Sequence, residues 1–294
     1  MSSSHDYKQD KRNNNIKIYI NGKFFLRKNA KISVFDSSVM LGDGCWDSLR
    51  FHNNKFIFLN EHINRLYKDA KLIDLKIPLK RKELINALNK TISVNKMITN
   101  VHLRIIVSRG IKSTPYQSPV VTISKPTIII IPEYKKPDIK IYKKGLKLVT
   151  VNTIRGPKNV QDPQINSLSK LNCILASIES NKLGYDEGIM NDLNGNISTC
   201  NSTNLFFIKD NQVITSTGEY CLNGITRGEV ISLCNKNNIK CNQIDFKFDD
   251  IMNCNEAFVT GTFAGVIPVS KLEGKKLDST NSESLVKKIR FLYN

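Results

Sequence analysis

The sequence predicts two domains of mixed α and β structure. Patterns typical of strands and of amphipathic helices follow one another without the regular strand–helix–strand alternation of a parallel α/β fold. The length of 294 residues fits two ordinary domains or one large one. A charged stretch with two prolines, PEYKKPDIKIYKKG at 132–145, is the best candidate boundary. We therefore expect a small N-terminal α+β domain at 16–133, a linker at 134–145 and a large C-terminal α+β domain at 146–294, which carries the segment with Asn166 and Lys170.

The N-terminal half is expected to contain a hairpin, two helices and two strands. The hairpin turns at Asn21-Gly22, because this dipeptide accepts the positive φ angles of a type I′ turn. The first helix places His62, Leu66 and Ala70 on one face at the spacing of an amphipathic helix. These elements are predicted, in order, at 16–25, 58–75, 81–95, 100–110 and 126–131.

The C-terminal half mixes strands and helices in the same irregular way. A strand, a helix after Lys170, a hairpin, a second helix and a final strand are expected in that order. They are predicted at 146–154, 170–180, 187–209, 226–238 and 256–261. Residues 1–15 are polar and charged, and we expect them to form a disordered tail.

The formal net charge of +18 comes from 44 Lys and Arg residues against 26 Asp and Glu. Such an excess can indicate nucleic-acid binding. These basic residues are spread along the whole chain, without a concentrated tract or interleaved aromatic residues. Nucleic acid is therefore not the expected partner, whereas a basic field that attracts anionic small molecules fits the composition.

Compartment and redox state follow from two further features. No apolar run is long enough to span a bilayer, and the N-terminus lacks the apolar segment of a secretory signal, so we expect a cytoplasmic protein with no membrane partner. Seven cysteines without a CxxC pair suggest neither a metal site nor a disulfide framework. Reduced and mostly buried thiols are expected.

Lys170 raises the question of a lysine nucleophile. It stands just ahead of an apolar stripe at helical spacing, and Ser167 is a candidate helix cap. The helix macrodipole disfavours a cation at this end, which would lower the pKa of a lysine that has to act as a neutral amine. A solvated surface lysine is the ordinary alternative. The stripe consists of Leu171, Ile174, Leu175 and Ile178.

Two loops and one arginine are suited to bind an anion. In NGITRGEV, Thr226 and Glu229 are spaced as a capping box, and Gly224 lets a ligand approach the backbone. A second loop, Gly261-Thr262, follows the predicted strand at 256–261, and free N–H groups at such junctions bind phosphate.

The guanidinium of Arg65 also suits a phosphate. Each of these features is common by itself. Together they predict a phosphorylated ligand.

Six segments, in order, resemble the fold-type IV pyridoxal-phosphate enzymes, also called class IV aminotransferases. This family includes branched-chain aminotransferases, D-amino-acid aminotransferases and aminodeoxychorismate lyase. The resemblance runs from about residue 17 to residue 273 and implies the two-domain fold-type IV architecture, pyridoxal 5′-phosphate as cofactor, amino-acid and 2-oxo-acid substrates and a homodimer. The segments are LGDGCWDSLR, EHINRL, NSLSKLNCILASIES, GNISTCNSTNLFFI, LNGITR and VTGTFAGVIPV.

The resemblance also implies roles for individual residues. Trp46 would line the pocket, and the N–H groups around Thr262 and Phe263 would help to bind a substrate carboxylate. Arg104 falls where branched-chain enzymes carry an arginine near that carboxylate, and His102 shares its strand face. The phosphate would be held by Arg65, by the backbone of Ile225 and Thr226, and by Thr262, in the loops that contain Gly224 and Gly261.

Two positions depart from the family pattern. Without a gap in the alignment, the Schiff-base lysine of the family falls at Asn166, which cannot make that bond. Lys170 falls four residues later, where branched-chain enzymes often carry a tyrosine against the ring hydroxyl of the cofactor. The family carboxylate on the pyridine nitrogen falls at Thr199, whose hydroxyl would leave the ring a weaker electron sink. Glu219 and Asp47 are other candidates for that nitrogen, but the sequence does not place them.

The sequence leaves two functions open. In the first, Lys170 replaces the missing nucleophile from one helical turn away, and the protein transfers an amino group from an apolar, branched-chain-like amino acid to 2-oxoglutarate. In the second, transamination has been lost, and the pocket binds pyridoxal phosphate or another phosphorylated ligand non-covalently. An aminodeoxychorismate lyase-type reaction is a more remote alternative, and it too needs the lysine.

Overall fold

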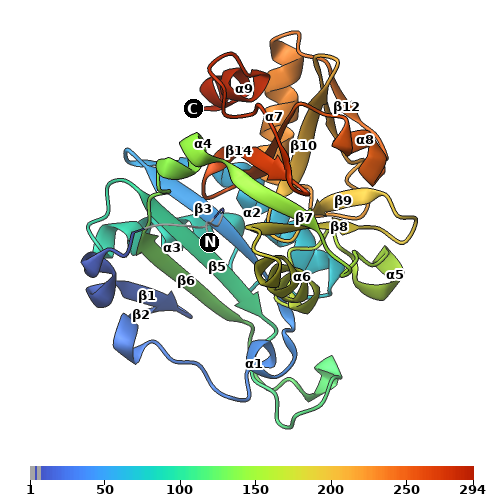
Figure 1. Cartoon of the computed structure of the whole chain (residues 1–294). Coiled ribbons are helices and arrows are strands. Elements are labelled where there is room, and N and C mark those ends of the chain that lie inside the picture. Colours follow the sequence, from blue (N-terminus) through green and yellow to red (C-terminus); the bar gives the residue numbers. More distant parts are fainter. Residues whose placement is uncertain (1–3, 5–7) are drawn as a thin grey trace. The chain divides into compact units, whose positions relative to one another are not determined.

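The computed structural model describes residue 4 and residues 8–294, which form two compact units (Figure 1). The N-terminal unit contains 8–136 and 165–170, and the C-terminal unit contains residue 4, 137–164 and 171–294. The segment 165–170, which we expected in the C-terminal domain, therefore belongs to the N-terminal unit. Of the expected disordered tail, 8–15 are part of the N-terminal unit, and 1–3 and 5–7 lie outside the described residues.

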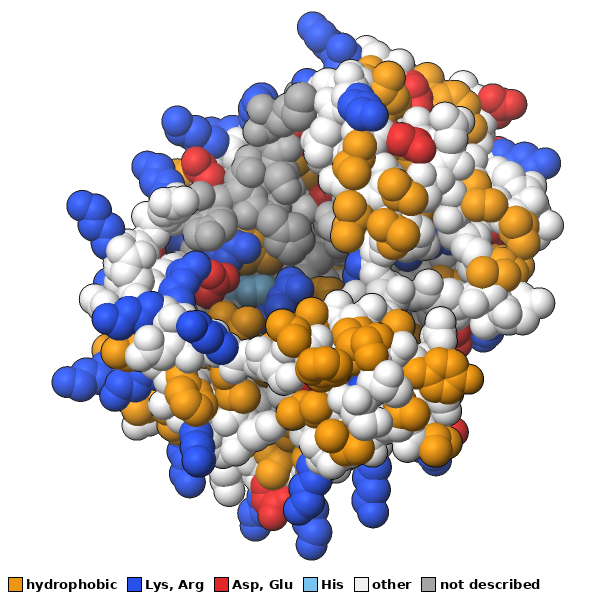
Figure 2. All heavy atoms as spheres, turned by 90° about the horizontal axis from the view of Figure 1, so that it is seen from below, with side chains coloured by type: hydrophobic (Ala, Val, Ile, Leu, Met, Phe, Trp, Pro, Cys, Tyr) orange, Lys and Arg blue, Asp and Glu red, His pale blue; other side chains and the backbone are white. Residues whose placement is uncertain are grey.

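Lys and Arg side chains are scattered over the face that Figure 2 shows, rather than gathered in one patch. This distribution agrees with the spread of basic residues along the sequence. None of the helices in the described part of the chain is long and apolar enough to cross a membrane. All seven cysteines are unpaired thiols and five of them are buried, as the sequence predicted.

The N-terminal unit is built on a six-stranded antiparallel sheet with the order β2-β1-β6-β5-β3-β4. Its strands are β1 (Lys17–Ile20), β2 (Lys23–Leu26), β3 (Gly44–His52), β4 (Lys55–Ile57), β5 (Val101–Ser108) and β6 (Thr127–Tyr134). Its helices are α1 (Ser37–Leu41), α2 (Leu59–Leu72) and α3 (Arg81–Val94), with the 3-10 turns η1 (Lys11–Asn15), η2 (Arg27–Asn29) and η3 (Pro119–Val121).

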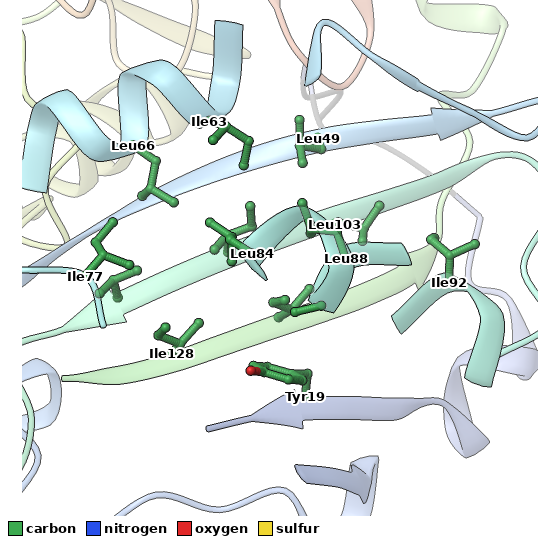
Figure 3. Close-up of a cluster of buried hydrophobic side chains, with 14 of the residues drawn as sticks. Tyr19, Leu49, Ile63, Leu66, Ile77, Leu84, Leu88, Ile92, Leu103 and Ile128 are labelled. Atoms are coloured by element: carbon green, nitrogen blue, oxygen red, sulfur yellow. The ribbon is translucent and has the colours of Figure 1, made fainter. Parts of the chain in front are cut away.

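One face of this sheet is covered by α2 and α3 (Figure 3). Successive strand residues point to opposite faces, and in β3 and β5 the odd-numbered residues, such as Leu49 and Leu103, are fully buried against the helices. From the helices, Ile63, Leu66 and Leu84 point toward the sheet. The even-numbered residues of these strands therefore lie on the other face, where the candidate site residues Trp46, His102 and Arg104 occur.

The C-terminal unit contains a nine-stranded mixed sheet with the order β12-β11-β10-β13-β14-β7-β8-β9, and β15 pairs with β14. Its strands are β7 (Leu146–Thr150), β8 (Glu187–Asn191), β9 (Ile197–Cys200), β10 (Asn204–Lys209), β11 (Gln212–Thr215), β12 (Cys241–Gln243), β13 (Glu256–Gly261), β14 (Gly265–Leu272) and β15 (Lys275–Lys276). Its helices are α4 (Lys140–Lys144), α5 (Lys158–Gln161), α6 (Leu171–Lys182), α7 (Ile225–Lys236), α8 (Phe248–Met252) and α9 (Leu285–Tyr293).

Helices α7 and α9 pack on β13 and β14, around the stacked rings of Phe206 and Phe258. The predicted hairpin at 187–209 is two structures: β8 pairs with β9, whereas β10 pairs with β11 and β13. The capping box at Thr226 is wrong, because the N-cap of α7 is Gly224 and Thr226 lies inside the helix. Ser167 is not a helix cap either. Its Oγ accepts a hydrogen bond from the N–H of Ser169, and α6 begins only at Leu171.

A glycine at the start of β3 allows the 165–170 segment to lie against the sheet. The N–H of Leu168 donates to the carbonyl of Gly44 at 3.0 Å, and Cys45 and Ser167 form an antiparallel bridge. A Cβ atom on Gly44 would overlap the carbonyl oxygen of Val107 and the side chain of Leu168. The second glycine of GDG is therefore required for this close approach.

Replacing Gly44 with alanine is expected to destabilise the protein by about 2–3 kcal/mol, because the new methyl group overlaps backbone atoms that cannot move aside. Denaturant unfolding measures this loss. Gly228→Ala on the open side of α7 is the matched control, since a Cβ there meets nothing within 4 Å, and it is expected to stabilise by up to about 1 kcal/mol. Equal stability of the Gly44 variant and the wild type would contradict the close approach.

Candidate active site

Both backbone polar groups of Asn166, its carbonyl and its N–H, are hydrogen-bonded within the N-terminal unit. Its carbonyl accepts a hydrogen bond from the N–H of Trp46 at 2.9 Å, and its N–H donates to Oδ2 of Asp69, on α2, at 2.9 Å. The indole Nε1 of Trp46 also donates to the carbonyl of Ser167 at 3.1 Å. Residues 166–168 therefore form an extended segment with a fixed position on the N-terminal unit.

This geometry changes the expectation for Lys170. The proposed role needs Lys170 to lie one helical turn from Asn166. Residues 166–168 instead run antiparallel to the start of β3, with one bridge between Cys45 and Ser167, and α6 starts only at Leu171. An extended chain advances about 3.4 Å per residue, against about 1.5 Å in a helix. Lys170 is therefore not one helical turn away. It lies at the end of the 165–170 segment, directly before α6, and is half-buried.

The side chain of Asn166 has an unsatisfied polar atom. The residue is 2% exposed, and its Oδ1 is buried without a hydrogen-bond partner among the described residues. A buried acceptor without a donor costs about 1–3 kcal/mol. A ligand group that donates a hydrogen bond would remove this cost.

Arg65 is part of a buried charge cluster. Its Nε and Nη2 donate to the two carboxylate oxygens of Asp47 at 2.9 and 2.8 Å, and Nδ1 of His62 lies 2.7 Å from the same carboxylate. Burial opposes ionisation of Asp47, but Arg65 and His62 outweigh it and lower the pKa of Asp47. Asp47 therefore serves as the counterion of Arg65, and the opposite edge of the guanidinium, at Nη1, is the part that can take an anion.

Asp69 lies four residues after Arg65 on α2 and was not anticipated. Burial raises its pKa to about 6, although the hydrogen bond from Asn166 and the charge of Arg65 oppose the shift. Its spacing of i+4 from Arg65 was the only sequence signal. A carboxyl group that titrates near neutral pH therefore supports the backbone of Asn166.

Trp46 and Arg104 meet on the open face of the N-terminal sheet. The Arg104 guanidinium lies over the indole, 4.0 Å from the ring centroid, in a cation–π contact. Burial lowers the pKa of Arg104, and Glu133 opposes that shift. His102 is buried on the same face and pairs with Glu133 across β5 and β6. The structure thus brings together three of the residues predicted to bind substrate.

The hydroxyl group of Thr199 donates its hydrogen bond to another residue of the C-terminal unit. Its Oγ1 donates to the carbonyl of Thr203 at 2.8 Å, and Oγ1 of Thr203 donates to Oε2 of Glu187 at 2.7 Å. Burial raises the pKa of Glu187, which favours the neutral acid. Glu187 is the carboxyl group linked to Thr199 by this network, and sequence reasoning missed it. Glu219, the other candidate, is exposed in a turn.

The first predicted phosphate loop is the N-terminus of α7. Its N-cap, Gly224, provides no side-chain cap for the first-turn N–H groups, which include those of Ile225 and Thr226. Asn204 of β10 anchors this turn, because its Nδ2 donates to the carbonyl of Leu222 at 2.9 Å. A Cβ atom on Gly224 would overlap Oδ1 of Asn204. The turn is therefore fixed, with its N–H groups at the positive end of a twelve-residue helix.

Arg227 adds an uncompensated charge to this turn. The residue is 4% exposed, and among the described residues its guanidinium donates only to neutral acceptors: Oδ1 of Asn223, the carbonyl of Ser216 and Oε1 of Gln243. Its Nε is buried without a partner among the described residues, and so is Nε of Arg155 elsewhere in this unit. Burial lowers the pKa of Arg227. Sequence reasoning missed both arginines, although Arg227 ends the quoted LNGITR segment.

The second predicted phosphate loop is the tight connection between β13 and β14. Gly261 pairs with Gly265, and the turn between them contains Thr262 and Phe263. Phe263 is buried, whereas Thr262 is partly exposed. The two loops are connected through the sheet of the C-terminal unit, because Asn204, which anchors the first loop, pairs with Thr260, directly before the second.

Comparison with known proteins identifies the family. Residues 44–272 match the model of the amino-transferase class IV family. The chain belongs to the class IV aminotransferases. It is 35% identical over 269 residues to branched-chain-amino-acid aminotransferase-like protein 2 of Arabidopsis thaliana, covering 91% of this chain but 48% of that protein. It thus spans about half the length of this relative.

Other relatives are matched along nearly their whole length. A Methanocaldococcus jannaschii protein named as a branched-chain-amino-acid aminotransferase is 33% identical over 277 residues, 94% of each chain. Among solved structures, the branched-chain amino acid aminotransferase of Thermobaculum terrenum in its PLP form superposes with a TM-score of 0.85 at 19% identity, covering 96% of this chain and 93% of that one. The fold-type IV architecture expected from the sequence is confirmed.

The residues of this class IV aminotransferase chain fit one part of the family cofactor and not another. The uncapped turn at Ile225 and Thr226, with the charge of Arg227 behind it, is suited to a phosphate. Asn166 offers an amide where the family has its lysine, so the residues do not fit covalent attachment.

Asp69 is expected to make stability depend on pH. Its folded pKa of about 6 lies above its ordinary value, so it stabilises the fold when protonated, and this contribution is lost as pH rises through about 6. Between pH 4 and 7 the wild type should lose on the order of 2 kcal/mol relative to Asp69→Asn, measured by urea unfolding. A pH-independent difference for Asp69→Asn would contradict the raised pKa.

Proposed function

We propose that this chain binds a vitamin B6 phosphate without a covalent bond, and that it has lost the transamination of its family. The observation that carries the proposal is the buried amide of Asn166 at the position of the family lysine. The comparisons establish the family only. Cofactor, substrate and loss of activity are proposals for this protein.

The phosphate end of the ligand accounts for the anion sites. Family resemblance assigns Arg65, Ile225, Thr226 and Thr262 to the phosphate. The Asp47 carboxylate fixes the orientation of Arg65, and the uncapped N-terminus of α7 supplies N–H groups. A dianionic phosphate would also compensate the buried charge of Arg227, which lowers the cost of burying that guanidinium.

At the other end of the ligand, the side chain of Asn166 favours an amine. Oδ1 of Asn166 is a buried acceptor that requires a donor. The amino group of pyridoxamine 5′-phosphate is a donor, whereas the aldehyde of pyridoxal 5′-phosphate is an acceptor. We therefore expect the amine form to bind more tightly.

Binding and covalent attachment are tested separately. Isothermal titration calorimetry should give a tighter Kd for pyridoxamine 5′-phosphate than for pyridoxal 5′-phosphate. Borohydride treatment with the aldehyde form, followed by mass mapping, should leave Lys170 unlabelled. Lys170→Ala should retain binding, and Asn166→Lys should acquire a borohydride-stable label at residue 166, which serves as the positive control.

A label on Lys170 in the wild type that disappears in Lys170→Ala would overturn the proposal. It would instead support the second candidate, transamination through Lys170. Absence of binding for both B6 phosphates would also refute the proposed ligand, and inorganic phosphate would then show whether the anion site exists at all.

The contact of Arg104 with Trp46 favours this second candidate function. A guanidinium held over an indole keeps its N–H groups available to a carboxylate, which suits an amino acid or 2-oxoglutarate. The candidate reaction would transfer an amino group from an apolar amino acid such as L-leucine to 2-oxoglutarate. The extended backbone at 166–168 weighs against this reaction, because an extended chain places Lys170 farther from Asn166 in space than one helical turn would.

We further infer that the chain forms a homodimer. The apolar stripe of α6 is exposed, with Leu171, Ile174, Leu175 and Ile178 between 44% and 65% exposed. An apolar helix face in solvent marks an interaction site, and the family implies a second copy as the partner. The remaining surface of α6 is anchored by Ala176 against β8.

Light scattering after size exclusion is expected to give twice the chain mass of 33.4 kDa. The double variant Ile174→Glu/Ile178→Glu should yield the monomer, because buried charges would be left without partners. Leu193→Glu, an equally exposed apolar residue in the turn between β8 and β9, should remain dimeric. A wild-type monomer, or an unaffected dimer in the α6 variant, would refute this interface.

A further inference from the structure

A hollow of about 610 Å³ lies in the N-terminal unit, in the region where the chain passes from α2 to α3. This volume is in the range of small-molecule sites. The proposed B6 phosphate does not use it, because none of its lining residues is among those assigned to that ligand. The hollow is lined by Asn64, Tyr67, Lys68, Ala70, Lys71, Asp74, Leu75, Lys76, Ile77 and Arg81.

The inner part of the hollow is apolar and rigid. Ala70, Leu75 and Ile77 are buried, and the ring of Tyr67 is half-buried beside them. The Tyr67 hydroxyl donates to the carbonyl of Leu79 at 2.7 Å, which fixes the ring. The guanidinium of Arg81 lies 5.3 Å from its centroid. A flat apolar group can therefore pack beside an ordered aromatic ring.

The loop after α2, which forms one wall of the hollow, is held in place by Arg109. Arg109 donates from Nη1 to the carbonyl of Asp74 at 3.0 Å and from Nη2 to that of Ile73 at 2.8 Å. The same guanidinium is paired with Asp43 through Nε, at 2.7 Å. The hollow is thus formed before any ligand arrives, which lowers the entropic cost of binding.

The rim of the hollow is strongly basic. It carries Lys68, Lys71, Lys76 and Arg81 against the single acidic residue Asp74. Lys and Arg make up 44 of 294 residues, so about one or two would be expected among ten lining residues, and four are present. None of the four cations forms an ion pair with another described residue. Such a cluster is balanced most effectively by an anionic ligand.

We propose that this hollow is a second binding site, for a small molecule that combines an aromatic ring with a phosphate. The ring lies on the apolar part beside Tyr67, and the phosphate binds the ammonium groups of Lys71 and Lys76. A nucleoside monophosphate and a simple aryl phosphate share this chemistry. The lining shares no residue with the set assigned to the B6 phosphate.

The test uses the full chain, with AMP as the nucleotide probe and phenyl phosphate as the aryl probe, in calorimetric titrations at low salt. Ribose 5-phosphate, which lacks the ring, and adenosine, which lacks the charge, should each bind at least fivefold more weakly than AMP. If phenyl phosphate binds more tightly than AMP, the site prefers a small aryl phosphate, and the opposite order indicates a nucleotide. Either order supports the shared chemistry.

Variants locate the binding. Lys71→Ser/Lys76→Ser should raise the Kd of the tighter probe at least tenfold, whereas Lys82→Ser/Lys90→Ser, two exposed lysines of α3 outside the lining, should change it less than twofold. Asp74→Asn removes the one repulsive charge and should tighten binding at least twofold. Asparagine suits this position, where φ is 49°.

Three results would overturn the proposal. The first is the absence of measurable binding for both probes. The second is an equal loss of affinity in the two lysine pairs, which would show that net charge alone attracts the anion. The third is equal affinity for AMP and ribose 5-phosphate, which would show that the apolar part contributes nothing.

Discussion

The pairing of residues 166–168 with the start of β3 is the constraint on which the candidate site depends. It requires a glycine at position 44, places the carbonyl of Asn166 on the N–H of Trp46, and brings the Asn166 N–H to Asp69. These two hydrogen bonds, with the one from the N–H of Leu168 to the carbonyl of Gly44, leave the backbone no freedom to turn another side chain into the place of residue 166. The chemistry available there is therefore set by the amide of Asn166. The fold does not compensate for the missing lysine, because it does not place Lys170 one helical turn from residue 166.

Arg65 of the N-terminal unit has a counterion within the protein, and Arg227 of the C-terminal unit has none among the described residues. In the N-terminal unit, the Arg65 guanidinium is paired with the Asp47 carboxylate, which also contacts His62, so the charge of Arg65 is neutralised within the protein and its geometry is fixed. In the C-terminal unit, the hydrogen bonds of Arg227 to described residues all go to neutral acceptors, and the N–H groups of the adjacent helix end have no side-chain cap. Buried cations without counterions are costly. An anion at the helix end would remove that cost, so the electrostatics of this unit favour phosphate binding without reference to any reaction.

Much of the fold follows from the sequence because periodicity and turn chemistry are local. The Asn21-Gly22 hairpin, the helical faces of α2 and α3 and the strand at 256–261 all lie where these signals place them. The errors arose where long-range pairing decides the structure. Thr226 was expected at the N-cap position of α7, which Gly224 occupies. The segment 165–170 was expected in the domain that follows it in sequence, although it pairs with β3. Asp69 and Glu187 were missed because their burial and partners come from distant parts of the chain.

Anion binding and covalent attachment have different requirements, and the residues of this chain fit only the first. Phosphate is bound by backbone N–H groups at a helix end and by an oriented guanidinium, so the site survives many side-chain changes as long as Gly224 and Asn204 keep the turn in shape. Covalent attachment depends on one amine at one position, and a single substitution removes it. Family membership therefore establishes the fold of this protein, whereas its chemistry follows the family only as far as the residues at 166 and 199 allow.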